Sequence, residues 1–330
     1  MSAIYTVLAS LLVALNTLAG ALLMLPFALI KFLLPIKAVR ALCDHALNSI
    51  ATGWVSVNGA WINAINRTRW RVSGLEGLNT KSWYLVISNH QSWVDILVLQ
   101  TILNRRAPFL KFFIKHELIY VPVIGLVWWA LDFPFMKRGG AATVQQDLEN
   151  ARKACEKFRL IPTSLISFAE GTRFTPEKHT AQKSPYKHLL KPKSGGVGMA
   201  LETMGDMFTQ VLDVTIAYPN GVPTFGDVLA GRLSEVVVQV QQLPVPHNLR
   251  PAPDQPISPM GLQRWIQRIW KAKDAQLEQI LNGGQAQAAA PVSTPETAPE
   301  TAAAEPAAET PAGTEAATTP SPAAAAQRST

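Results

Sequence analysis

The sequence predicts an α/β fold with a mostly parallel sheet and helices on both of its faces. Short apolar runs of five to eight residues recur along the chain, which is typical of strands buried on both sides. Stretches with helical periodicity separate the runs, and this alternation is the pattern of parallel strands joined by helices. The predicted strands are Trp83–Ile87, Leu110–Ile114, Thr163–Phe168 and Val211–Tyr218.

The remaining predicted strands and helices have a less distinct pattern of apolar residues. Arg69 to Gly74 is expected to form a short strand, and a further strand should end at Met136. Leu233–Leu243 alternates apolar and polar residues and is predicted to be an edge strand. Helices are expected up to about Leu103, over Ala141–Phe158 and over Ser258–Leu281, the last of these amphipathic.

The N-terminal part of the chain is expected to be embedded in a membrane. Residues 2–30 contain no charged side chain and exceed the twenty or so residues that span a bilayer. Basic residues begin only at Lys31, which places the rest of the chain in the cytoplasm, against a bacterial-type inner membrane. A cleaved signal peptide is disfavoured because no basic segment precedes the apolar run. We favour a spanning helix, while Pro26 and Pro35 leave a re-entrant hairpin open.

Composition divides the chain into four parts. A membrane-embedded helix or hairpin (1–36) is followed by an amphipathic helix (37–68) and a globular α/β domain (69–282). The amphipathic helix is placed at the membrane interface, and packing on the globular core is an equal alternative. An Ala/Pro/Thr/Glu-rich tail (283–330) is predicted to be disordered, because it cannot bury enough apolar surface to offset its ordering entropy.

The charge distribution predicts an anionic partner. The chain carries +7 overall; five Glu and one Arg give residues 291–330 a charge of −4, so residues 1–290 carry +11. A membrane surface, phosphorylated lipid, coenzyme A or acidic carrier protein would fit. Nucleic acid is disfavoured, since the basic residues form no helical stripe and the N-terminus is apolar. Cys43 and Cys155 fit no metal or disulfide framework, which favours a reducing compartment.

Polar residues follow three of the predicted strands, where ligands bind in α/β sheets. These groups are His90 with Asp95, Lys137 with Arg138, and the tetrad Glu170, Gly171, Thr172 and Arg173. A carboxylate five residues after an imidazole can hold one ring nitrogen, which leaves the other free to take a proton. Each group has an ordinary alternative as a turn, a helix cap or a local ion pair.

Together these motifs resemble the glycerolipid acyltransferase superfamily, in particular the lysophosphatidic acid acyltransferase (PlsC-like) family. The resemblance covers roughly residues 70–225 and rests on NHQSWVD, FMKR and FAEGTRF in this order. It implies a glycerol-3-phosphate acyltransferase-like fold and makes 69–282 the acyltransferase domain. Ala169 stands where many members have proline, so the acceptor is less certain than the reaction.

The resemblance also implies roles for the individual residues. His90 would be the general base and Asp95 would orient it. Glu170, Gly171, Thr172 and Arg173 would bind the glycerol phosphate of a lysophospholipid, with Lys137 and Arg138 adding phosphate contacts. Backbone N–H groups at the start of the following helix could stabilise the oxyanion.

No metal or cofactor is expected, because acyl-CoA or acyl carrier protein brings its thioester as a substrate. His116 and Glu117 lack the second histidine of a zinc motif, and Ser92 is interpreted as a helix cap, not a nucleophile. The alternatives are acylation of another lysophospholipid or hydroxyl lipid, and a non-catalytic membrane-anchored interaction or lipid-binding protein. The oligomeric state is not predicted.

Overall fold

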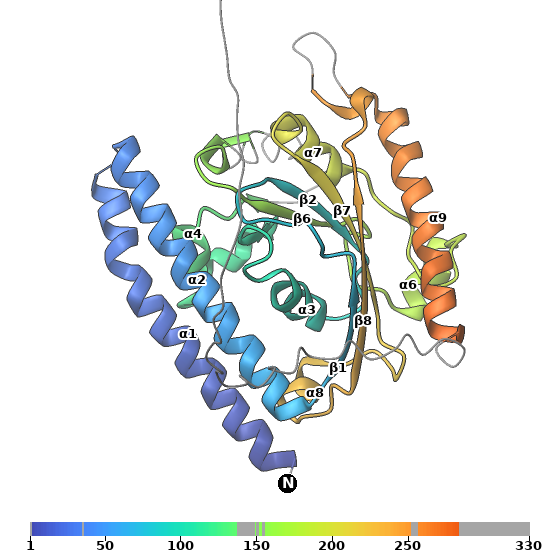
Figure 1. Ribbon diagram of the computed structural model, residues 1–330, viewed down its shortest axis with the longest axis horizontal. Coiled ribbons are helices and arrows are strands. Elements are labelled where there is room, and N and C mark those ends of the chain that lie inside the picture. Colours follow the sequence, from blue (N-terminus) through green and yellow to red (C-terminus); the bar gives the residue numbers. More distant parts are fainter. Residues whose placement is uncertain are drawn as a thin grey trace, which may run out of the picture. The chain divides into compact units, whose positions relative to one another are not determined.

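A computed structural model of the protein describes residues 2–34, 36–136, 149, 152–153, 156–251 and 257–283. The predicted α/β class is confirmed, with a mostly parallel sheet between two layers of helices (Figure 1). The main sheet contains β1 (Arg69–Ser73), β2 (Tyr84–Ser88), β3 (Leu110–Phe112), β6 (Ser164–Phe168), β7 (Gln210–Ala217) and β8 (Glu235–Leu243). Its order is β1-β8-β7-β2-β6-β3, and β7, β2, β6 and β3 run parallel.

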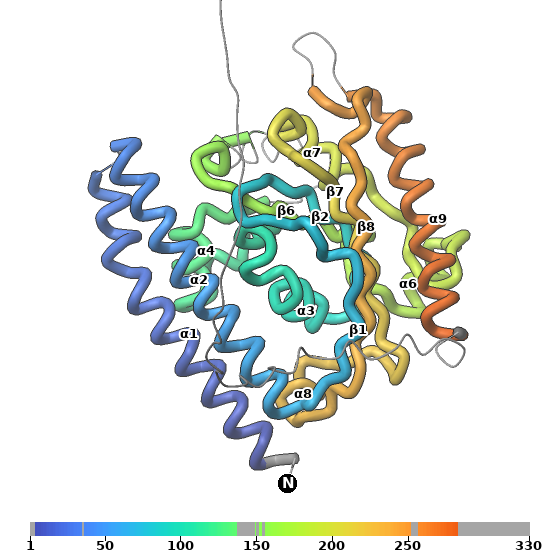
Figure 2. Tube along the Cα trace, in the orientation of Figure 1, coloured from blue at the N-terminus to red at the C-terminus, as the bar shows by residue number. Residues whose placement is uncertain are grey.

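The helices cover both faces of this sheet (Figures 1 and 2). They are α1 (Ser2–Leu33), α2 (Lys37–Asn66), α3 (Val94–Leu103), α4 (Ile124–Ala130), α6 (Pro176–Gln182), α7 (Gly195–Met204), α8 (Phe225–Leu229) and α9 (Pro259–Gly283). Two 3-10 turns, η1 (His116–Tyr120) and η2 (His247–Leu249), complete the described elements.

Two details differ from the sequence-based expectation, and a third expectation is not tested. β8 is not the edge strand, because β1 pairs with it in parallel and β7 pairs with it in antiparallel. The strand that ends at Met136 does not join the main sheet; β5 (Phe135–Met136) pairs only with β4 (Ile114–Lys115). Most of the predicted helix 141–158 and of the predicted disordered tail lie outside the described residues. Pairing partners are chosen by tertiary packing, which a single strand's pattern does not encode.

The side chains of the central strand β2 alternate between two hydrophobic cores, one on each face of the sheet. Successive side chains of a strand point to opposite faces, so Tyr84 and Val86 pack toward α3 while Leu85 and Ile87 pack toward α7 and α9. All four side chains are at most 1% exposed. The continuous apolar run therefore reflects a strand covered on both faces.

Helices α1 and α2 form an antiparallel hairpin along one side of the domain (Figure 2). Trp54 of α2 donates its indole N–H to Thr17 of α1 at 3.2 Å. Lys31, in the last turn of α1, has a side chain that is 8% exposed and forms ion pairs with Asp44 of α2 and with Asp132, which follows α4. Polar contacts thus join the two helices to each other at the middle of the hairpin, and its closed end to the domain through Asp132.

The outer face of α1 is apolar and has no covering element among the described residues. Large hydrophobic side chains from Ile4 to Leu33 are 41–66% exposed along this face. Of the described helices, α1 alone is long and apolar enough to cross a membrane, over Ile4–Leu33.

Candidate active site

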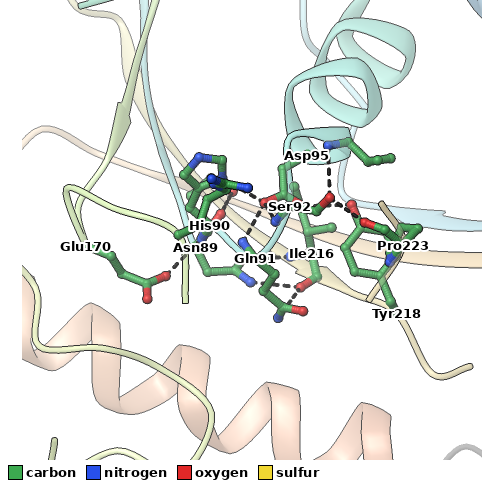
Figure 3. Close-up of polar contacts among 12 residues, drawn as sticks. Asn89, His90, Gln91, Ser92, Asp95, Glu170, Ile216, Tyr218 and Pro223 are labelled. Atoms are coloured by element: carbon green, nitrogen blue, oxygen red, sulfur yellow. Dashed lines mark hydrogen bonds and ion pairs between the residues drawn. The ribbon is translucent and has the colours of Figure 1, made fainter. Parts of the chain in front are cut away.

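The register of the sheet brings the first and third motifs together. β2 and β6 are paired so that Ser88 lies beside Phe168. His90 and Glu170 each come two residues later, so both reach the same edge at the carboxyl ends of parallel strands. The His90 backbone N–H donates to Glu170 Oε1 at 2.8 Å, as Figure 3 shows.

Residues 89–93, which connect β2 to α3, form the histidine loop. Asp95 holds this loop through both of its carboxylate oxygens. His90 Nδ1 lies 2.8 Å from Oδ2, which also accepts the N–H groups of Gln91 at 2.6 Å and Ser92 at 2.8 Å. The hydroxyl of Tyr218 donates to Oδ1 at 2.6 Å. Asp95 itself is in the first turn of α3, where the helix dipole favours a negative charge. The carboxylate is therefore fully engaged, and its position is set from two strands and one helix.

The imidazole of His90 is fixed on its face as well as at its edge. The Phe168 ring stacks on it with centroids 4.0 Å apart and planes 19° from parallel. The side chain keeps 12% of its surface exposed. Because an ionised carboxylate only accepts hydrogen bonds, Nδ1 must carry the proton in this contact, and Nε2 of the neutral ring is then the basic nitrogen.

Glu170 is buried, and its carboxylate ties two segments together. Besides the His90 amide, it accepts the Leu190 N–H on Oε2 at 3.0 Å, and the residue is 0% exposed. Burial, which outweighs these two hydrogen bonds, raises the pKa of the Glu170 carboxyl from 4.5 to about 7, and the nearby Asp95 charge adds to the rise. No part of this side chain faces solvent.

The rest of the EGTR turn is open to solvent. Gly171 has φ of +69°, which glycine adopts without strain, and Arg173 is exposed with its guanidinium 4.9 Å above the Trp93 ring. Lys178 donates to the Thr172 hydroxyl at 2.8 Å and to the Arg173 carbonyl at 3.0 Å. The Arg173 guanidinium is thus held over Trp93, three residues after His90, and pairs with no carboxylate among the described residues.

Several backbone N–H groups around the start of α3 already have partners within the protein. The N–H groups of Gln91 and Ser92 donate to Asp95, and the Val94 N–H lies 3.2 Å from the Ser92 hydroxyl. The Ser92 hydroxyl is buried and in turn donates to the Pro223 carbonyl, whereas the N-cap position of α3 is Trp93, so Ser92 is a structural residue but not the predicted N-cap. Lys137 and Arg138 lie outside the described residues, so their predicted phosphate contacts remain predictions.

Three supporting residues were not singled out from the sequence. Asn89 exchanges two hydrogen bonds with the backbone of Ile216, at 2.8 and 2.9 Å, and so locks the loop onto β7. Tyr218 and Phe168 complete the set. Tyr218 had a detectable signal, a phenol at the end of an apolar strand directly before a proline. The stacking by Phe168 had none, because it depends on the pairing of β2 with β6.

An apolar cavity of about 510 Å³ opens near this site between α1, α2, α3 and α4. Trp93, three residues after His90, lines it together with Ile96 and Leu97 of α3. Ala21 of α1 and Trp54 of α2 line the opposite wall. Within the described part of the chain, no group of three or more His, Cys, Asp or Glu side chains could hold a metal ion.

Comparison with known proteins shows which sequences this chain resembles. A family profile described as Acyltransferase matches residues 69–219. The 1-acyl-sn-glycerol-3-phosphate acyltransferase 3 of Arabidopsis thaliana is 30% identical over 213 residues, which cover 60% of this chain and 54% of that protein. The human 1-acyl-sn-glycerol-3-phosphate acyltransferase gamma is 27% identical over 61% of this chain and 54% of its own length. The matches thus span about half the length of these curated relatives.

The matching profile and the names of these relatives support the predicted resemblance to the lysophosphatidic acid acyltransferase (PlsC-like) family, and they are consistent with an O-acyltransferase. A crystal structure of the 1-acyl-sn-glycerophosphate (LPA) acyltransferase PlsC from Thermotoga maritima aligns with 18% identity and a TM-score of 0.45 over 81% of this chain and 98% of that one. The support for the resemblance comes from the sequence matches and not from this superposition.

The raised pKa of Glu170 predicts a pH-dependent stability. The proton is bound more tightly in the folded state, so the linked stabilisation is fully present below pH 4.5 and is lost as pH rises through about 7. The Tm of the detergent-solubilised wild type should therefore decrease as the pH is raised from 4.5 to about 7. The comparison at each pH is with the Tm of Glu170→Gln, which lacks the titrating carboxyl. Parallel Tm profiles for the two proteins would show that Glu170 does not titrate in this window.

Proposed function

We propose that this protein transfers a fatty acyl group from a thioester, acyl-CoA or acyl carrier protein, to the free hydroxyl of lysophosphatidic acid, giving phosphatidic acid. The observation that carries the proposal is the 2.8 Å contact between His90 Nδ1 and Asp95, beside the exposed guanidinium of Arg173. A base, its orienting carboxylate and a cationic group for phosphate are the parts that this reaction needs.

His90 acts as the general base in the proposed mechanism. Nε2 removes the proton of the acceptor hydroxyl as that oxygen attacks the thioester carbonyl carbon. The tetrahedral intermediate then collapses, the carbon–sulfur bond breaks, and the thiolate takes the proton from the imidazolium. Asp95 keeps the ring in one tautomer and stabilises the imidazolium that forms between the two steps.

The EGTR tetrad divides into two roles. Arg173 binds the acceptor phosphate, and Gly171 and Thr172 shape the turn that presents it. Arg138 and Lys137, at the end of the second motif, add charge to the same phosphate. Glu170 is a positioning residue, because its buried carboxylate is bonded to the amides of His90 and Leu190 and is not available to substrate.

The apolar cavity is proposed to hold the acyl chain. Its walls are hydrophobic side chains, and it begins beside Trp93 at the start of α3, within one helical turn of the histidine loop. Burying a chain of methylenes there would contribute about 0.8 kcal/mol for each one.

We also propose that the α1–α2 hairpin lies against one leaflet, in place of the spanning helix that the sequence favours. α2 packs along α1 on one side and on the domain core on the other, through Leu47, Trp61 and Ile62. If α1 crossed the bilayer, the polar side chains of α2 and part of the domain would enter the hydrocarbon, which is costly. Lys31 is paired internally, so it gives little support to a charge-based orientation.

The catalytic proposal is tested with His90→Ala, alongside His45→Ala as a control on an exposed position of α2. Acyl transfer is measured from oleoyl-CoA and from oleoyl-acyl carrier protein to a panel of lysophospholipids. His90→Ala should lose about 10²-fold or more in kcat, the range for a general base, while His45→Ala should match wild type. A wild type that turns over with neither donor would sink the proposal and favour a binding protein. Turnover of another lysophospholipid alone would keep the chemistry and change the acceptor.

The acyl-chain proposal is tested by filling the cavity from α1. Ala21→Phe projects a ring into it, whereas Ala19→Phe places the same ring on the exposed side of the helix. We expect Ala21→Phe to shift preference toward shorter acyl chains in competition assays, with Ala19→Phe unchanged. An unaltered chain-length profile in Ala21→Phe would remove this cavity from the acyl-binding site.

The membrane proposal is tested by cysteine labelling in sealed vesicles after Cys43 and Cys155 are replaced by serine. A cysteine at Ser2 is compared with one at the exposed Lys81 of the domain, using a membrane-impermeant maleimide. A hairpin on one leaflet places both on the same side, so both should label to the same extent. Complementary labelling, each site reacting only where the other is protected, would restore the spanning helix.

A further inference from the structure

A polar groove lies on the other side of the sheet from the α1–α2 hairpin. It has a volume of about 1390 Å³ and is formed by α9 and the segment that follows α6. Its lining extends from Ser258 to Glu278, which corresponds to about 30 Å of helix at 1.5 Å per residue. In Figure 1, α9 and the hairpin flank the domain on opposite sides. This groove takes no part in the mechanism proposed above.

Three cations of α9 line the groove. Arg264, Arg268 and Lys271 follow one another at spacings of four and three residues, so they share one face of the helix. All three are exposed, and no carboxylate in the described part of the chain lies within ion-pair distance of them.

The acidic residues of the groove are already occupied. Asp274 accepts the backbone N–H groups of Lys187 and His188, each at 2.8 Å. Glu278 pairs with the Lys187 ammonium at 2.6 Å and with His188 Nε2 at 2.5 Å. The charge that remains for a ligand is therefore positive.

The groove is connected to the candidate active site by a short segment. Lys187 is three residues before Leu190, and Glu170 bridges the amides of Leu190 and His90. Three residues of extended chain span about 11 Å, so the groove begins on the order of 20 Å or less from His90. Lys191 continues the positive charge along the surface, and Lys193 lies beside Gly171.

The size of the groove and the spread of its cations favour a protein as the ligand over a small anion or a lipid. Its volume exceeds the roughly 300–1,000 Å³ of a small-molecule pocket, and its cations are spread along one helix face and do not converge on one point. A membrane that holds the outer face of α1 would lie on the far side of the domain. A soluble partner with an acidic helix would complement the row of cations.

We infer that this groove is the docking surface for an acidic acyl carrier protein, which delivers the acyl thioester to His90 from the side opposite the membrane. The inference rests on the proposed acyltransferase function and names the donor that this function leaves open. The carrier holds its acyl group on a flexible arm, so its body can remain on α9 while the thioester reaches the edge of the sheet. Coenzyme A has no protein body and does not use this surface.

The test compares the double charge reversal Arg264→Glu/Arg268→Glu with Lys81→Glu/Arg106→Glu, which changes the net charge equally at exposed positions away from α9. kcat/KM is measured with oleoyl-acyl carrier protein and with oleoyl-CoA. Binding of fluorescently labelled carrier protein is measured separately by polarisation, without turnover. We expect the α9 variant to lose about tenfold or more with the carrier donor, through KM, and to stay within about twofold of wild type with oleoyl-CoA. Added salt should weaken carrier binding to wild type.

Other outcomes overturn the inference in distinct ways. If the α9 variant loses kcat/KM equally with both donors, the α9 cations have a role unrelated to the carrier. If the control variant loses as much kcat/KM as the α9 variant, the effect comes from net charge and not from the groove. A wild type that turns over oleoyl-CoA but does not bind carrier protein removes the docking surface and leaves the proposed function intact. If wild type turns over with neither donor, the proposed function fails, and carrier binding that depends on Arg264 and Arg268 would still support the surface.

Discussion

The carboxylate of Asp95 is the constraint on which the site depends. It is buried and accepts hydrogen bonds from an imidazole, two backbone amides and a phenol, drawn from the loop after β2 and from the end of β7. A buried charge with fewer donors would be costly. The same four contacts that stabilise the charge also set the orientation of His90, so the stability of the loop and the orientation of the proposed base have one origin. Burial and the Asp95 charge raise the pKa of Tyr218 well above 10, which keeps this fourth donor protonated.

Around this carboxylate, the sheet separates two functions. On one face, the α1–α2 hairpin and α3 enclose an apolar cavity and present an uncovered apolar helix. On the other face, α9 presents a row of exposed cations. In the proposed reaction, the first face meets the membrane and holds the acyl chain, and the second face binds the body of the carrier that brings the thioester. Glu170 is at the junction, where it links the loop of His90 to the segment that leads to α9.

Much of the fold could be predicted from local pattern. The runs at Tyr84 and Leu165 are apolar on both faces because their strands are covered on both faces, and that pattern is present in the sequence. The order of the strands in the sheet, in contrast, could not be predicted from the sequence. β8 alternates like an edge strand and lies inside the sheet, because β1, the first strand of the chain, pairs with its outer side. The sequence left a spanning helix and a re-entrant hairpin open for the N-terminal apolar run, and only the packing of α1 against α2 argues for a placement on one leaflet.

The motifs themselves determined the chemistry that this chain can carry, since His90, Asp95 and Arg173 were recognisable by type and spacing. Tertiary structure decided what each of these side chains does. Glu170 belongs to the same motif as Arg173, yet the in-register pairing of β2 with β6 buries its carboxylate against two amides and leaves the guanidinium outside. Phe168 became part of the site by the same pairing, and Tyr218 by the pairing of β2 with β7. Sequence specifies which groups are available, whereas contacts between distant segments determine which are exposed, ionised or held, because burial and hydrogen bonding act only after the strands have met.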